Sequence, residues 1–292
     1  MIYFDNSATT FIKPANVYNR VYEIMKRYAG NSGRSGHYLS MKANDIIFDA
    51  RETLAEYFNI KNPERVCFTP NATYALNFAI KGCVNKGDKV LISGFEHNSV
   101  VRPLYSVGAD IMQFPWYNFD EYDKIEEMLD GVKVIVVNHM SNVNGNIADI
   151  STIGRIARKN NIIFIVDASQ SAGHIDIDVQ RDNIDILACA GHKGLFGPQG
   201  TGVLYVREGL NLNSLVEGGT GSLSESYEQP SVYPDRFEAG TLNVACIGGL
   251  AEGVKFLMNN KAFVEYEKSL AGKMMSGLSM IKGVKIYNNK NI

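Results

Sequence analysis

The chain has 292 residues, is 45% hydrophobic and carries a formal net charge of -2. This length and composition allow one large buried core with a small appended domain. The charge is close to zero and no basic cluster occurs, which argues against the electrostatic attraction by which proteins bind nucleic acid or acidic membranes. We therefore expect neither of these partners.

The cysteines and the amino-terminal residues indicate the compartment. The four cysteines have no CxxC spacing and lie mostly within or beside apolar runs, which predicts buried free thiols in a reducing cytoplasm. Residues 1–5 lack the features of a signal peptide, and no run reaches the length of a membrane span. The five histidines show no paired ligand spacing, so we expect no metal site.

Apolar, strand-like runs alternate with helix-periodic segments along most of the chain, a rhythm typical of parallel βαβ units in an α/β fold. The expected strands are 66–69, 89–93, 110–114, 133–137, 162–166, 184–188 and 202–206. The expected helices are 15–28, 41–58, 73–81, 120–129 and 150–159. A polar, glycine-rich stretch at 218–234 predicts a long loop, followed by helices at 244–259 and 263–280 and a strand at 284–287.

Two of these strands end in side chains that belong together chemically. Asp167 follows the run 162–166, and Lys193 follows the run 184–188 among glycines. Parallel strands present such residues in the crevice where α/β folds bind ligands. Pyridoxal 5′-phosphate (PLP) needs this pair, because a lysine amine bonds to its aldehyde and an acid keeps its pyridine nitrogen protonated. Alone, Asp167 could instead cap a helix, with Gln170 completing a capping box, and a lone lysine is usually a surface charge.

Further polar residues follow other expected strands. Residues 69–77 lead from the strand 66–69 through a turn into the helix expected from Thr73, where free backbone N–H groups would favour an anion such as a phosphate. The alternative is an ordinary Asn or Thr helix cap. His97 could stack on a pyridine ring, although an isolated histidine is usually a satisfied polar residue. Asn142 could bond a cofactor phenolate or a substrate carboxylate, and we expect His139 to be structural.

Seven motifs occur in the order seen in the class V aminotransferases, which are PLP enzymes of fold type I. They are Asp5-Asn6-Ser7-Ala8-Thr9-Thr10, Arg34-Ser35-Gly36-His37, Glu96-His97-Asn98, Ser141-Asn142-Val143-Asn144-Gly145, Asp167-Ala168-Ser169-Gln170, Gly191-His192-Lys193 and Phe237-Glu238-Ala239-Gly240-Thr241. Jointly they are very specific, and they run from residue 2 to about 250. The chain most closely resembles the cysteine desulfurases and selenocysteine lyases of the SufS-like group.

The resemblance implies a mostly parallel seven-stranded sheet flanked by helices, with an incomplete small α+β domain at the carboxyl end. Residues 1–13 would line the active site, residues 14–258 would form the large PLP-binding domain, and residues 259–292 would begin a truncated small domain. It also implies a homodimer. The nucleophilic cysteine and the substrate-binding arginine of the desulfurases would then lie beyond Ile292.

The resemblance also implies roles for individual residues. Lys193 would hold PLP and move the Cα proton, and His97 would stack on the ring. The other cofactor contacts would come from Asp167 at the pyridinium, Gln170 at the phenolic oxygen, Thr73, Ala72 and His192 at the phosphate, Asn142, and Thr241 of the other subunit. Substrate contacts would come from Asn142, His37 and Ala8. Ala190 departs from the pattern, because SufS-like enzymes usually have a phosphate-binding serine there.

The implied reaction converts L-cysteine to L-alanine and passes the sulfur to a protein thiol or an acceptor protein, in sulfur metabolism and iron–sulfur cluster assembly. Other class V reactions stay open: an aminotransferase, a racemase, a selenocysteine lyase or a β-lyase. A PLP-fold protein without desulfurase activity is a further alternative. A nucleotide-binding domain ranks last, because no GxGxxG follows the first strand and no Walker lysine appears.

Overall fold

The computed structural model of the protein describes residues 2–33, 36–114 and 122–287. Arg34 and Ser35 of the second motif, the start of the expected helix 120–129, and the two ends of the chain lie outside these ranges. Within them, no helix combines the length and the apolar composition needed to cross a membrane.

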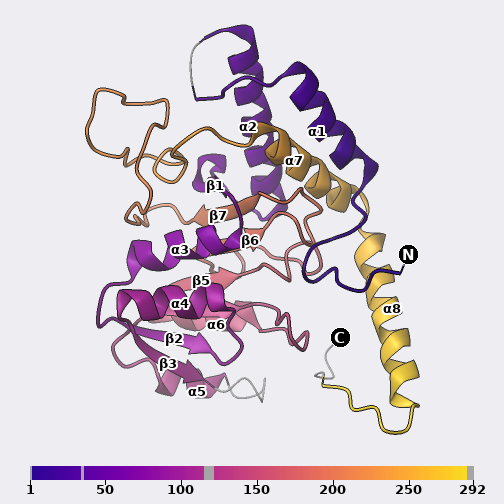
Figure 1. The fold of residues 1–292 in the computed structure, drawn as a ribbon. Coiled ribbons are helices and arrows are strands. Elements are labelled where there is room, and N and C mark those ends of the chain that lie inside the picture. The colour runs from indigo at the N-terminus through magenta and orange to yellow at the C-terminus, as the bar shows by residue number, and fades with distance from the viewer. Residues whose placement is uncertain (1, 34–35, 115–121, 288–292) are drawn as a thin grey trace.

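The described chain contains one sheet with the strand order β1-β7-β6-β5-β4-β2-β3 (Figure 1). The strands are β1 (Val66–Thr69), β2 (Lys89–Ser93), β3 (Asp110–Phe114), β4 (Val132–Asn138), β5 (Ile163–Asp167), β6 (Ile186–Ala190) and β7 (Gly202–Val206). Every neighbouring pair is parallel except those of β7, which runs antiparallel to both β1 and β6. The expected mostly parallel seven-stranded sheet is confirmed.

Helices cover both faces of the sheet. They are α1 (Ala15–Arg27), α2 (Tyr38–Tyr57), α3 (Ala72–Cys83), α4 (Asn98–Val107), α5 (Asp123–Glu127), α6 (Ile150–Lys159), α7 (Val244–Asn259) and α8 (Ala262–Ser279). Side chains of a strand alternate between two apolar cores. Leu91 belongs to the core that includes residues of α2, α6 and α7, whereas Val90 and Ile92 belong to the core that includes residues of α3 and α4. Helix α1 lies outside, against α7.

Two expectations about the elements are wrong. Residues 284–287 form no strand and are mostly exposed, since an extended segment needs a partner strand to be stable. Helix α4 was not expected, because Pro103 interrupts its pattern. It forms because Val100 and Leu104 reach the core and because His97 accepts a hydrogen bond from the Ser99 amide at the first turn.

The other elements that differ from the expected ones do so only in the residues at which they begin and end. Helix α2 begins three residues before the expected start at 41, because His37 Nδ1 accepts a hydrogen bond from the Ser40 amide and caps the helix at Tyr38. Strand β6 starts and ends two residues later than expected. Every residue of 184–190 is buried, so the sequence has no alternation from which the strand ends could be read.

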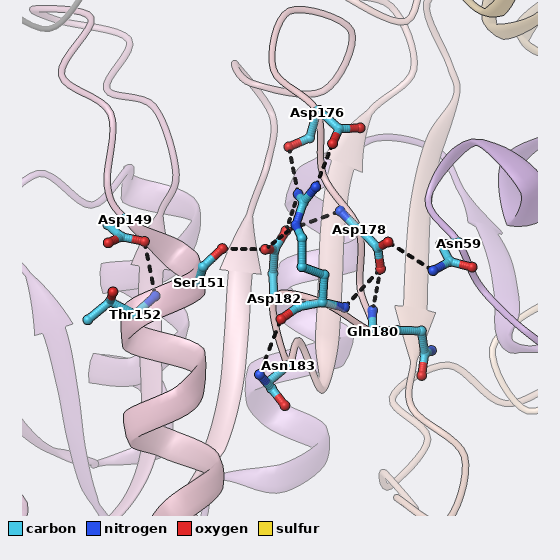
Figure 2. A network of polar contacts seen from close by, with 10 residues as sticks. Asn59, Asp149, Ser151, Thr152, Asp176, Asp178, Gln180, Asp182 and Asn183 are labelled. Atoms are coloured by element: carbon cyan, nitrogen blue, oxygen red, sulfur yellow. Dashed lines mark hydrogen bonds and ion pairs between the residues drawn. The ribbon is translucent and has the colours of Figure 1, made fainter.

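The loop between β5 and β6 is held by a polar network (Figure 2). Ser151 on α6 donates a hydrogen bond to the Asp182 carboxylate, and Arg181 Nε lies 2.9 Å from Asp182 Oδ1. Asn59, after α2, donates to Asp178 over 2.9 Å. These contacts tie the loop to two helices and so fix where β6 enters the sheet. Strand β6 leads directly to Lys193.

Candidate active site

A cavity of about 390 Å³ lies at the carboxyl ends of the strands. Strand β1 runs in the same direction as β6, because β7 is antiparallel to both, so β1, β2, β4, β5 and β6 all end at this edge. The structure brings most of the predicted site residues to the cavity wall: Lys193, Asp167, Gln170, His97, Thr73, Ala72, His192, Asn142 and Ala8.

Lys193 and Asp167 come from neighbouring parallel strands, with Asp167 opposite Ala188 in the ladder. Asp167 is only 2% exposed, and its Oδ1 accepts hydrogen bonds from the Ser169 amide at 2.9 Å and the Ser169 hydroxyl at 2.5 Å. Burial lowers the pKa of Lys193, while the charge of Asp167 opposes this shift. A lowered pKa leaves more of the amine neutral, the form that attacks an aldehyde.

The amino terminus of α3 forms another wall through Ala72 and Thr73. Asn71 caps the helix by accepting a hydrogen bond from the Tyr74 amide over 3.1 Å. Gly202 on β7 permits this placement, because a Cβ there would lie 2.4 Å from the backbone carbon of Asn71. Backbone N–H groups of a first helical turn have no acceptor within the helix, so this wall suits a phosphate.

His97 connects α4 to α3. Its Nδ1 lies 3.1 Å from the Ser99 amide nitrogen and 2.9 Å from Ser99 Oγ, and that hydroxyl lies 2.9 Å from Thr73 Oγ1. The chain of contacts therefore links the imidazole predicted to stack on a ring to the helix predicted to bind a phosphate. Sequence reasoning did not single out Ser99, although it lies two residues after His97.

Glu96 precedes His97 and is buried between β2 and β4. Its Oε1 accepts hydrogen bonds from the Asn138 amide over 2.8 Å and from the Ser93 hydroxyl. Its Oε2 is buried and has no hydrogen-bond partner in the described chain. Burial raises the pKa of Glu96 to about 8, so the carboxyl is mostly protonated at neutral pH. Sequence reasoning quoted Glu96 within a motif but assigned it no role.

The amino-terminal segment closes one side of the cavity. Asp5, Ser7 and Ala8 line it, and the Ser7 carbonyl accepts a hydrogen bond from Gln170 Nε2 over 3.0 Å. Sequence reasoning missed the residues that hold this segment down, Thr9, Thr10 and Lys13. The motif containing Thr9 and Thr10 could have identified two of them.

Two predicted residues do not line this cavity. His37 is exposed and caps α2. Thr241 is also exposed, and its hydroxyl accepts a hydrogen bond from Asn31 Nδ2 over 3.3 Å. The predicted role of Thr241 belongs to a second subunit, so its place outside its own cavity is compatible with that role. Both roles stay predictions.

None of the cysteines lines the described cavity: Cys67, Cys83, Cys189 and Cys246. Cys67 and Cys189 are fully buried, and burial raises the pKa of the Cys67, Cys83 and Cys189 thiols. The expectation of buried thiols is confirmed for Cys67 and Cys189, while Cys83 and Cys246 are partly exposed. A raised pKa suppresses the reactive thiolate.

The donor set fits PLP. A buried carboxylate is available for a ring cation, an amine of lowered pKa for an aldehyde, and a helix amino terminus for a phosphate. The imidazole of His97 and the carboxamide of Gln170 also line the cavity.

The comparisons with known proteins agree with this chemistry. The family model described as aminotransferase class V matches residues 2–292. A probable cysteine desulfurase of Pyrococcus abyssi is 32% identical, over 100% of this chain and 76% of its own length. The apo structure of a cysteine desulfurase from Thermococcus onnurineus is 31% identical with a TM-score of 0.90, and 99% of this chain matches 76% of that one.

A third similar protein is SspA, solved in complex with cysteine. It is 29% identical with a TM-score of 0.75, and the match covers 87% of this chain and 72% of SspA. Members of the class V aminotransferase family depend on PLP, the cofactor that the cavity fits. The chain belongs to this family and is related within it to cysteine desulfurases.

Proposed function

We propose that this chain is a PLP-dependent enzyme that removes sulfur from L-cysteine and releases L-alanine. The observation that carries the proposal is the cavity in which Lys193 and Asp167, from adjacent parallel strands, meet the amino terminus of α3. The family match indicates PLP as the cofactor, and the relatives named as cysteine desulfurases support L-cysteine as the substrate.

PLP, when bound, accepts the electron pair released as a bond at the substrate Cα breaks. The chain would supply the rest of the chemistry. Lys193 Nζ holds the cofactor and moves the Cα proton, helped by a lowered pKa. Asp167, which accepts two hydrogen bonds from Ser169, would keep a proton on the ring nitrogen. His97 would stack on the ring, and Gln170 would hydrogen-bond its phenolic oxygen.

The remaining predicted contacts complete the proposed site. Thr73, Ala72 and His192 would bind the phosphate, while Asn142, Ala8 and His37 would contact the substrate. The chain would act as a cytoplasmic homodimer, with Thr241 reaching the partner's phosphate. Support for this comes from the exposed position of Thr241 and from the free cysteines, which suit a reducing compartment. The released sulfur would enter iron–sulfur cluster assembly.

The sulfur acceptor in this proposal is a thiol other than the four cysteines, since none of them lines the described cavity. The same observation favours a second candidate, a class V reaction that needs no protein thiol. Such an enzyme would be an aminotransferase, a racemase, a selenocysteine lyase or a β-lyase.

Incubation of the PLP-loaded protein with L-cysteine and dithiothreitol separates these functions. Desulfuration gives equal amounts of alanine and sulfide, because dithiothreitol supplies the reducing equivalents that release sulfide. A β-lyase gives pyruvate instead of alanine, and an aminotransferase needs an added keto acid. PLP binding with none of these products would contradict the proposed reaction.

Borohydride reduction followed by peptide mapping tests the cofactor lysine itself. We expect the label on the peptide that contains Lys193, and we expect Lys193→Ala to lose both the label and the yellow colour while remaining folded. Lys159→Ala, at an exposed position on α6, is the matched control and should keep both. A yellow Lys193→Ala protein would show that another lysine holds PLP.

A further inference from the structure

The amino-terminal segment forms hydrogen bonds to the backbone on both sides of Lys193. The Thr10 amide donates to the His192 carbonyl over 3.1 Å, and the Thr9 hydroxyl donates to the same oxygen over 3.3 Å. The Thr10 hydroxyl donates to the Lys193 carbonyl over 2.8 Å. Two threonines, 183 positions away in the sequence from the groups they bond, therefore hold both peptide groups that flank the proposed cofactor lysine.

Lys13 adds a charged contact at the same place. Its Nζ lies 3.1 Å from the His192 carbonyl oxygen and 3.1 Å from the Thr10 carbonyl oxygen. The ammonium is partly buried, and burial lowers the pKa of Lys13. Among the described residues, no carboxylate forms an ion pair with it.

The His192 carbonyl oxygen does not need Lys13 as a hydrogen-bond donor. A carbonyl oxygen has two lone pairs, and Thr9 and Thr10 already donate to it. The third donor brings a positive charge, and its partial desolvation costs free energy unless an anion lies nearby. The titratable groups that line the cavity are Asp5, His97, Asp167, His192 and Lys193, so Lys13 is a second cation beside it.

We propose that Lys13 is a positioning residue for Lys193. Its ammonium donates hydrogen bonds to the carbonyl oxygens of Thr10 and His192, and so holds these two segments together. It also places a positive charge beside the site of the anionic cofactor. The proposal rests on the proposed function, because it takes Lys193 as the lysine that holds PLP. Lys13 would not touch the substrate. It would set the geometry and the electrostatic environment of the loop from which Lys193 projects.

The test compares Lys13→Met, Lys13→Gln and Lys13→Arg with the wild type. The control is Lys26→Met, which removes an exposed lysine of α1 whose Nζ contacts the Tyr22 hydroxyl. Three quantities are measured: the melting temperature, the dissociation constant for PLP added to the apoprotein, and the pH midpoint of the absorbance change of the chromophore at Lys193.

We expect Lys13→Met to bind PLP about tenfold more weakly, the size of effect that loss of a hydrogen bond to a charged group produces. The pH midpoint should rise, because removing a nearby positive charge makes protonation at Lys193 easier. Lys13→Gln keeps a donor but no charge, so its midpoint should rise as well. Lys13→Arg keeps the charge, so its PLP affinity and its pH midpoint should be close to those of the wild type. Lys26→Met should change neither quantity.

Wild-type affinity and an unchanged midpoint in both Lys13→Met and Lys13→Gln would overturn the proposal, and so would an Arg variant that restores neither. If Lys13→Met does not fold, Lys13→Gln and Lys13→Arg decide the question in the same way. Failure of the proposed function is seen separately, in the wild type, as a Lys193 peptide that borohydride does not label.

Discussion

At the scale of single residues, the site combines groups whose burial changes their acid–base behaviour in opposite directions. Burial favours the neutral form of each, so the pKa of Lys193 falls and the pKa of Glu96 rises to about 8. A protonated Glu96 adds no negative charge to the site in which Asp167 and Lys193 lie.

Glu96 therefore predicts a pH-dependent stability. Its pKa rises from 4.5 to about 8 on folding, so the folded protein binds more protons than the unfolded chain between these values. The contribution of protonated Glu96 to the free energy of unfolding is fully present below pH 4.5, and it is lost as the pH rises toward 8. Glu96→Gln removes this loss, so the variant should gain stability relative to the wild type as the pH rises.

Urea unfolding of both proteins at about pH 5 and pH 8 measures the effect. One pKa unit corresponds to about 1.4 kcal/mol, and we expect the difference in unfolding free energy to change by more than about 1 kcal/mol between the two conditions. Glu52→Gln, at an exposed position on α2, is the control and should show a smaller change. An equal difference at both pH values would mean that Glu96 is ionised in the folded protein.

At the scale of elements, a buried ion pair joins α2, β1 and the loop that contains Thr241. Arg51 on α2 donates hydrogen bonds to the Glu238 carboxylate and to the Val66 carbonyl. Glu238 also accepts a hydrogen bond from the Phe68 amide over 2.6 Å. Both side chains of the pair are almost fully buried. The pair thus fixes the loop three residues before Thr241.

Breaking this pair should be costly. Arg51→Ala leaves Glu238 buried without its cation, and we expect a loss of about 3–5 kcal/mol in unfolding free energy. The double variant Arg51→Met with Glu238→Leu removes both charges and should be more stable than Arg51→Ala. Denaturant unfolding of the single and double variants measures this. A double variant less stable than Arg51→Ala would contradict the interpretation.

At the scale of the whole molecule, the carboxyl-terminal helix adds little to the core. Helix α8 extends beyond the body of the fold (Figure 1), and none of its residues is fully buried. Two anchors hold it: the Phe263 ring lies 5.4 Å from the Phe196 ring, and Glu267 lies 2.6 Å from His174 Nδ1. Leu270 and Met274, further along, are exposed.

Two truncations separate these anchors from the rest of α8. A chain ending at Lys268 keeps both and should melt within about 2 °C of the full chain, since losing exposed residues changes stability little. A chain ending at Asn260 loses both and should melt about 4 °C or more lower, because Phe196 loses the Phe263 ring that packs against it. Equal melting of the two chains would show that the anchors contribute nothing.

Much of the sheet could be predicted from the sequence, because apolar runs and the turns between them mark buried strands directly. The ends of β6 could not be read from the sequence: β6 lies two residues later than expected, since a strand buried on both faces has no polar–apolar alternation. Helix α4 could not be predicted past Pro103, and the strand at 284–287 is wrong because strand pairing is not encoded locally.

The sequence by itself determined the pairing of Lys193 with Asp167, because both follow buried parallel strands whose carboxyl ends meet at one edge. Only the tertiary structure decided that Lys13 reaches the His192 carbonyl, that Glu96 is buried with a raised pKa, and that none of the four cysteines lines the described cavity. Local patterns fix which strand a residue follows. Burial and contacts between distant segments depend on how the whole chain packs.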